Sequence, residues 1–60
     1  MTKETIINSL DDARRHAYAI WAEYHERSLD SAAFTDIRDF FEMRVRALDY
    51  AMEAIRHDAI

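Results

Sequence analysis

Two acid and histidine pairs in this sequence have a spacing that could bind a metal ion. Asp12 and His16, and likewise Glu53 and His57, are four residues apart, which places the side chains of each pair on the same side of a helix. Helical metal sites use this spacing, but they also need further ligands. Neither pair has a third ligand beside it, so we interpret both as surface ion pairs and predict no metal site.

Hydroxyl and thiol nucleophiles are the next residues that could perform chemistry. The chain has no cysteine, and Ser9, Ser28 and Ser31 fall where helices are expected to begin or end, positions at which serine acts as a cap. No serine has a base and an orienting group in reach, and a chain without glycine cannot form a glycine-rich phosphate loop. The sequence therefore predicts a protein that is not an enzyme and holds no cofactor.

A polar and aromatic shoulder on the first predicted helix is a candidate binding surface. At ~100° per residue, one shoulder of this helix is formed by Arg14, Tyr18, Trp21 and His25. Tyrosine, tryptophan and arginine are enriched at protein interfaces. We expect Trp21 to belong mainly to the core and Tyr18 to be partly exposed. The shoulder is interpreted either as a second face for a partner protein or as aromatic shielding of the helix packing.

The stretch from Phe34 to Ile55 carries two apolar lines when it is wound as a helix. The first line consists of Ile37, Phe41, Leu48, Met52 and Ile55. The second line consists of Phe40, Met43, Ala47, Tyr50 and Ala54. One neighbouring helix can cover the first line but not both. The second line, together with Arg44, is therefore predicted to form a dimer interface or to bind a partner.

Arg44 is a charge at the junction of these two lines. Charged residues are seldom buried without a partner. One interpretation is that its guanidinium pairs with a carboxylate across a helical bundle while its stem covers apolar surface. The other is that it meets an acidic group on a target protein, because arginine is common among the residues that dominate binding energy. The sequence leaves both interpretations open.

The elements that position these residues are two helices joined by a short turn, in a single domain of residues 1–60. Thr2 is suited to cap a first helix of about residues 3–28. The turn is expected at about residues 29–31, with Asp30 as the N-cap of a second helix of about residues 31–57, and Thr35 offers a later start. A turn this short makes the helices run antiparallel. The predicted fold is an all-α, antiparallel two-helix hairpin.

Composition favours the assembly of this hairpin into a larger unit. With 60 residues the chain can bury only a small core, and without cysteine it has no disulfide or thiolate metal site to stabilise that core. A second copy related by a two-fold axis would cover the second apolar line. We therefore expect a homodimeric four-helix bundle.

Charge and hydropathy limit the classes of partner. The formal net charge is -4, from 12 acidic and 8 basic residues, and it disfavours nucleic acid and anionic membrane surfaces. The longest apolar run, from Ala17 to Ala22, is far shorter than the ~20 residues that cross a bilayer. A cytoplasmic protein without membrane contacts is expected.

Short matches to a known hairpin family point to a different function. The matching residues are Met1-Thr2-Lys3, Leu29-Asp30 at the turn, and Asp36-Ile37. In these residues, in length and in two-helix design, the chain resembles Rop, a plasmid copy-number regulator that grips paired RNA loops as a hairpin dimer. The resemblance implies RNA binding as an alternative function. At the positions where Rop contacts RNA, this chain has Leu10, Arg14, Tyr18 and His25, which provide only part of such a face.

The function predicted from these observations is that of a small non-enzymatic regulator or inhibitor, encoded by a phage or plasmid, that acts by binding another protein. Its expected partners are a second copy of the chain and a target protein. One alternative is a Rop-like RNA-binding hairpin dimer. A second alternative is a structural subunit of a hetero-oligomeric helical assembly.

Overall fold

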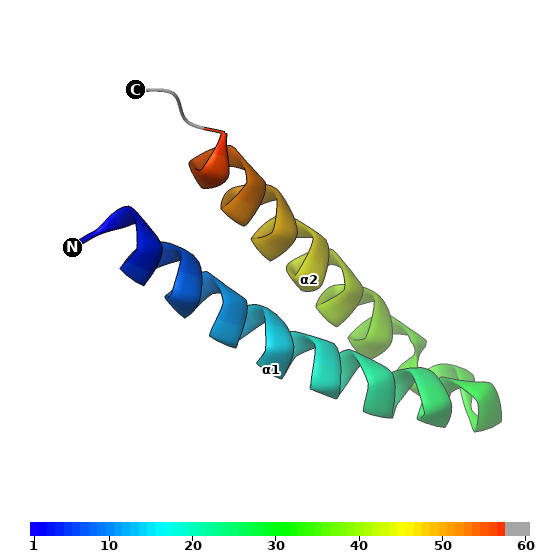
Figure 1. Ribbon diagram of the computed structural model, residues 1–60. Coiled ribbons are helices and arrows are strands. Elements are labelled where there is room, and N and C mark those ends of the chain that lie inside the picture. The colour runs from blue at the N-terminus through cyan, green and yellow to red at the C-terminus, as the bar shows by residue number, and fades with distance from the viewer. Residues whose placement is uncertain (58–60) are drawn as a thin grey trace.

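The protein folds as two long antiparallel α-helices joined by a tight turn (Figure 1), in a computed structural model that describes residues 1–57. Helix α1 spans Lys3–Asp30, a 3₁₀ turn η1 spans Ala32–Phe34, and helix α2 spans Thr35–Arg56. The start of α1 and the end of α2 lie at the same end of the molecule (Figure 1). The prediction of an all-α hairpin is therefore confirmed.

Helix α1 begins at a side-chain cap. Thr2 has an extended backbone, and its hydroxyl accepts a hydrogen bond of 3.1 Å from the backbone N–H of Thr5. This bond satisfies one of the N–H groups that the first turn of a helix leaves without a partner. Glu4 lies in the same turn, where the helix dipole favours a negative charge. The start of α1 is thus determined by residues within the first turn.

The turn differs from the sequence prediction because Ser31, and not Asp30, breaks the helix. Asp30 is the last residue of α1, two residues beyond the predicted end, and the prediction that it caps the second helix is wrong. Ser31 is extended, and its backbone N–H donates to the carbonyl of Arg27 at 3.0 Å. Its hydroxyl accepts from the N–H of Ala33 at 3.3 Å. One residue therefore closes α1 and opens the next turn, so no glycine is needed.

The 3₁₀ turn leads into α2 and is held against α1 by aromatic contacts. The α-helical hydrogen bonding starts at Thr35, the later of the two starts that the sequence offered. The Phe34 ring lies 5.9 Å from the Tyr24 ring, measured between centroids. The guanidinium of Arg27 lies 5.5 Å from the Tyr24 ring and 5.9 Å from the Phe34 ring. These contacts, each of a kind worth about 0.5–1 kcal/mol at exposed sites, anchor the turn.

The molecule is a single layer of two helices. Its extents are 46 × 15 × 12 Å, and its smallest dimension is about the diameter of one helix. Among the described residues only Ala17 and Met52 are buried, with 2% and 4% of their surface exposed. The apolar contact is therefore a seam between the helices, and both broad faces of the pair are open.

The two apolar lines of α2 have different surroundings. Met52 is buried, and the other residues that turn toward α1 are half-buried: Phe41, Val45, Leu48 and Ile55. Ile37, at the edge of the first line, is 38% exposed. The second line points away from α1 because its residues lie about 120–180° around the helix from Met52. The single chain thus covers the first line and leaves the second uncovered.

Candidate interaction surface

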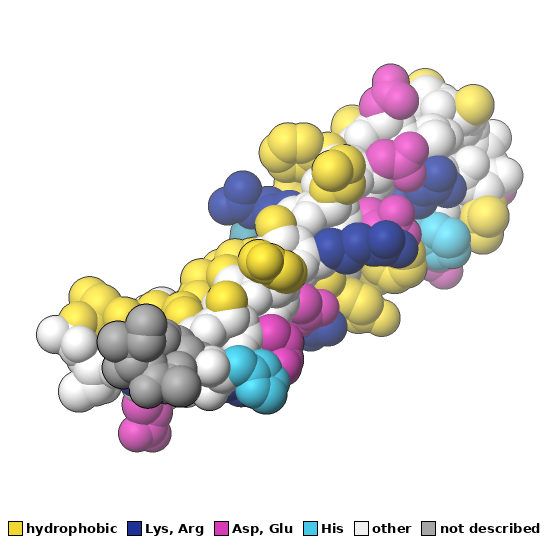
Figure 2. All heavy atoms as spheres, turned by 90° about the horizontal axis from the view of Figure 1, so that it is seen from above, with side chains coloured by type: hydrophobic (Ala, Val, Ile, Leu, Met, Phe, Trp, Pro, Cys, Tyr) yellow, Lys and Arg dark blue, Asp and Glu magenta, His cyan; other side chains and the backbone are white. Residues whose placement is uncertain are grey.

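The outer face of α2 is the main candidate site. We use this name for the predicted second line with its arginine, namely Phe40, Met43, Arg44, Ala47, Tyr50 and Ala54, all of which are exposed. Phe40, Met43 and Tyr50 expose 61%, 71% and 79% of their surface. Figure 2 shows apolar side chains in a row along the molecule, with charged side chains on either side. Large apolar side chains in a continuous row are typical of an interaction site.

A shallow hollow lies in the middle of this outer face. It has a volume of about 370 Å³ and is lined by Phe40, Met43, Arg44 and Ala47. The edge of the Phe40 ring packs against Phe41, with 5.2 Å between ring centroids and an interplanar angle of 83°. This contact supports Phe40 from within its own helix while most of the ring faces solvent. The outer face therefore offers a partly ordered aromatic group beside an open space.

Arg44 projects from this face without a partner in its own chain. Its side chain is exposed, and it forms no ion pair with any other residue in the range 1–57. Both sequence interpretations of Arg44 invoke a second molecule, so both stay predictions. Within the chain, Arg44 is a free positive charge on an apolar surface.

The predicted shoulder of α1 forms a continuous stack of side chains. The Arg14 guanidinium lies 6.0 Å from the centroid of the Tyr18 ring. The Tyr18 and Trp21 rings follow at 5.5 Å, and the Trp21 and His25 rings at 4.9 Å and 15°, a stacked arrangement. Tyr18 is 51% exposed and Trp21 is half-buried. The structure thus brings all four predicted shoulder residues together.

An ion pair joins the α1 shoulder to α2. The Arg14 Nε donates to a carboxylate oxygen of Asp49. The two residues are 35 positions apart, and no local sequence pattern pairs them. Only the alignment of the antiparallel helices reveals that they face each other. The pairing fixes the guanidinium of Arg14 and neutralises its charge, so the shoulder is aromatic rather than basic.

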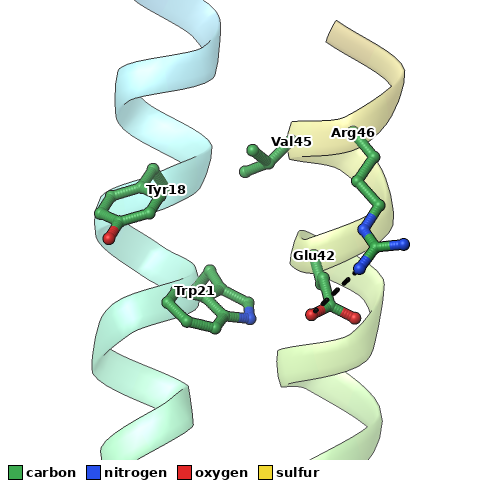
Figure 3. Close-up of a pocket in the computed structure, with 5 residues that line it drawn as sticks. All are labelled: Tyr18, Trp21, Glu42, Val45 and Arg46. Atoms are coloured by element: carbon green, nitrogen blue, oxygen red, sulfur yellow. Dashed lines mark ion pairs between the residues drawn. The ribbon is translucent and has the colours of Figure 1, made fainter. Parts of the chain in front are cut away.

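A small apolar cavity lies between the helices beside the shoulder (Figure 3). Its volume is about 170 Å³, and its walls are Tyr18 and Trp21 from α1 and Glu42, Val45 and Arg46 from α2. Figure 3 shows Glu42 and Arg46 side by side on α2, joined by an ion pair of 3.9 Å. The three α2 residues were not among the predicted site residues, because they belong to neither apolar line. The cavity could hold one aliphatic side chain of a partner.

Two buried nitrogen atoms near this cavity have no hydrogen-bond partner within residues 1–57. They are Nε1 of Trp21 and Nδ1 of His25. Leaving a buried polar group unpaired costs about 1–3 kcal/mol. The shoulder therefore has an apolar cavity and two unsatisfied polar atoms within a few residues of each other.

Residues 1–57 contain neither a cluster of metal ligands nor a helix that could cross a membrane. Within this range no group of three histidine, cysteine, aspartate or glutamate residues is placed to hold a metal ion. Of the two pairs with metal-site spacing, Glu53 and His57 contact each other at 2.9 Å, whereas Asp12 and His16 are both exposed. Neither helix in this part of the chain is both long and apolar enough to cross a bilayer.

No protein-family model, curated protein or solved structure matches this chain. Function is therefore inferred from the outer face of α2 and from the shoulder of α1.

Proposed function

We propose that the protein is a small non-enzymatic regulator or inhibitor that works by protein–protein interaction, as a homodimeric four-helix bundle. The observation that carries the proposal is the row of exposed apolar side chains on the outer face of α2. Phe40, Met43 and Tyr50 are each more than half exposed in the single chain. A surface of this kind on a small protein is a place where another chain binds.

The small size of the buried core supports a dimer. Only Ala17 and Met52 are buried among the described residues, and a chain of 60 residues has little apolar surface left to bury by itself. Two hairpins that cover each other's outer faces would form the second layer that a single hairpin lacks. In such a protein, folding and dimerisation are coupled, and stability depends on protein concentration.

The shoulder of α1 is the surface proposed to contact the target. It presents Tyr18, Trp21 and a small cavity, which suit the insertion of a side chain from another protein. Nucleic acid is a weaker candidate, because the net charge is -4 and the arginines of α1 are paired with carboxylates. A phosphate would have to compete with those carboxylates.

Capture from the native host tests the target site with a matched pair of histidine variants. His25 is stacked on Trp21 in the shoulder, whereas His16 is exposed on the opposite side of α1. We expect His25→Ala and Tyr18→Ala to lower the recovery of one specific protein at least tenfold, a loss of about 1.4 kcal/mol. His16→Ala should leave recovery unchanged, and circular dichroism should show the same helix content for all three variants.

Three results would contradict this proposal. Recovery of RNA alone, with binding that falls steeply as salt rises, would favour the Rop-like alternative. Stoichiometric co-purification with a different helical chain, together with an unfolded isolated protein, would favour the hetero-oligomeric subunit. Equal recovery with His25→Ala and His16→Ala would remove the shoulder as the target site.

A further inference from the structure

Arg44 differs from every other arginine of the protein. Six of the seven arginines form an ion pair within the chain: Arg14 with Asp49, Arg15 with Asp11, Arg27 with Glu23, Arg38 with Asp39, Arg46 with Glu42, and Arg56 with Glu53. Arg44 pairs with no residue of the described range, although it lies near the middle of α2 and is exposed. Its position on an apolar face requires a different explanation from that of the other arginines.

Asp36 is the negative counterpart of Arg44 on the same helix. The other carboxylates of α2 are already paired: Asp39, Glu42, Asp49 and Glu53. Asp36 is exposed in the first turn of α2 and has no ion pair with any residue in the described part of the chain. The helix dipole favours an anion at this position, but it leaves the carboxylate oxygens free to accept from a cation. Helix α2 thus retains one unpaired charge of each sign.

The two unpaired charges cannot satisfy each other within one chain. Asp36 and Arg44 are eight residues apart, so they are separated by about 12 Å along the helix axis. Asp36 lies on the side of α2 that points away from α1, and Arg44 lies at the edge of that side, about 80° around the helix from Met52. Phe40 is midway between them and is 61% exposed. The pattern along this side is therefore negative, aromatic and positive, with equal spacing on each side of the aromatic residue.

We infer that the occupant of the outer face of α2 is a second copy of this chain, packed antiparallel with the two-fold axis near Phe40, so that Arg44 of each copy pairs with Asp36 of the other. This inference rests on the dimer in the proposed function and specifies its register. A two-fold axis makes such an interface self-complementary. If residue i of one copy contacts residue j of the other, then residue j of the first copy also contacts residue i of the second. An antiparallel alignment centred on residue 40 places residue 44 opposite residue 36.

The apolar side chains of the outer face fit this register. The two Phe40 rings meet at the axis, and the hollow lined by Met43 and Ala47 gives each copy space for the other. Tyr50 and Ala54 lie past the level of Thr35 of the other copy, where its α2 begins, so in this register they are not covered by that helix. The buried centre is then aromatic and aliphatic, with an ion pair on each side, as is typical of protein interfaces.

A register centred on Ala47 is the principal competitor. It would cover Tyr50 and Ala54 more fully, but it would place Tyr50, and no carboxylate, opposite Arg44. A desolvated arginine without an anion is costly. Electrostatic complementarity therefore selects the register centred on Phe40 over the one centred on Ala47.

Charge reversal tests the ion pair. We expect Arg44→Asp and Asp36→Arg each to weaken dimerisation about tenfold or more, because each change places like charges opposite one another twice. The double variant, which restores opposite charges, should recover dimerisation to within about threefold of the wild type. Arg15→Asp is the control, since Arg15 is 75% exposed and pairs with Asp11 on α1. Its reversal should leave the dissociation constant unchanged.

Cysteine cross-linking tests the register independently of charge. The protein has no cysteine, so a single introduced thiol can only link to the same position of another copy. Helices packed at about 8–10 Å bring residues on the axis within disulfide range. We expect oxidised Phe40→Cys to form a covalent dimer rapidly, and Ala47→Cys to remain largely monomeric on a denaturing gel.

The possible outcomes separate this inference from the proposed function. A wild-type protein that is monomeric at all concentrations would overturn both the register and the proposed dimer. A wild-type dimer that cross-links through Ala47→Cys but not Phe40→Cys would overturn the register and leave the dimer intact. Failure of the double charge reversal to restore dimerisation would overturn the ion pair. The double variant is needed because Asp36→Arg alone also weakens the start of α2, and only the rescue isolates the contact between the copies.

Discussion

Arg14 on α1 and Asp49 on α2 form an ion pair across the hairpin, whereas the other arginine pairs of the described chain each lie within one helix. The pair is part of the shoulder, since the Arg14 guanidinium also lies 6.0 Å from the Tyr18 ring. It therefore connects the two helices beside the small cavity. Its energetic contribution is limited by solvent, because the two side chains are 35% and 49% exposed.

A double-mutant cycle measures this contribution. We expect Arg14→Ala and Asp49→Ala to show a coupling of about 0.2–1 kcal/mol in the free energy of unfolding, the range of partly exposed ion pairs. Urea denaturation at a fixed protein concentration gives the four values of the cycle. A coupling of zero at low salt would show that the pair does not form in solution.

Truncation of methionine tests the division of α2 into a covered and an uncovered line. Met52 is 4% exposed, so Met52→Ala should lower the free energy of unfolding by about 2–5 kcal/mol. Leu29 is 74% exposed and lies outside both lines. Leu29→Ala should therefore change the free energy of unfolding by less than about 0.5 kcal/mol. Met43→Ala distinguishes the assemblies: a dimer predicts a cost clearly larger than that of Leu29→Ala, together with a stability that rises with protein concentration, and an isolated hairpin predicts a change as small as that of Leu29→Ala.

Removal of the Ser31 hydroxyl tests the turn. Ser31 accepts from the N–H of Ala33, and Ser31→Ala should therefore destabilise the protein by about 1 kcal/mol. Ser9 is exposed in the second turn of α1, so the expectation that it marks a helix end is wrong; Ser9→Ala is the matched control, with no loss expected. Thermal unfolding followed by circular dichroism gives both values. Equal melting temperatures for the two variants would contradict the capping role of Ser31.

Two replacements of Trp21 separate its ring from its N–H group. Trp21→Phe keeps an aromatic ring and removes a buried N–H that has no acceptor in the described chain. We therefore expect it to change the free energy of unfolding by no more than about 1 kcal/mol. Trp21→Ala removes the ring and should cost about 2 kcal/mol or more. Chemical denaturation measures both. A loss for Trp21→Phe as large as that for Trp21→Ala would show that the N–H is bonded in solution.

The periodicity of the sequence predicted the helices and the two lines of α2, because apolar spacing on a helix depends only on residues within that helix. Met52 and Phe41 turn toward α1, and Phe40 and Tyr50 turn away, as the projection indicated. The turn was less predictable, since Asp30 and Ser31 are both good capping residues. Backbone geometry selected Ser31.

The cavity and the cross-helix ion pair could not be predicted from either helix alone. They depend on the alignment of α1 with α2, which places Val45 beside Trp21 and Asp49 beside Arg14. No local pattern contains that alignment. A search for opposite charges at positions that an antiparallel hairpin aligns could have found the Arg14 and Asp49 pair.

Sedimentation equilibrium of the unmodified protein across a range of concentrations is a direct test of the proposed dimer. We expect a species of twice the 7.1 kDa chain mass at micromolar concentrations, and helix content that falls as dilution dissociates it. Phe40→Glu should shift the protein toward monomer at the same concentrations. A folded 7.1 kDa monomer with constant helix content over the whole range would rule out the dimer.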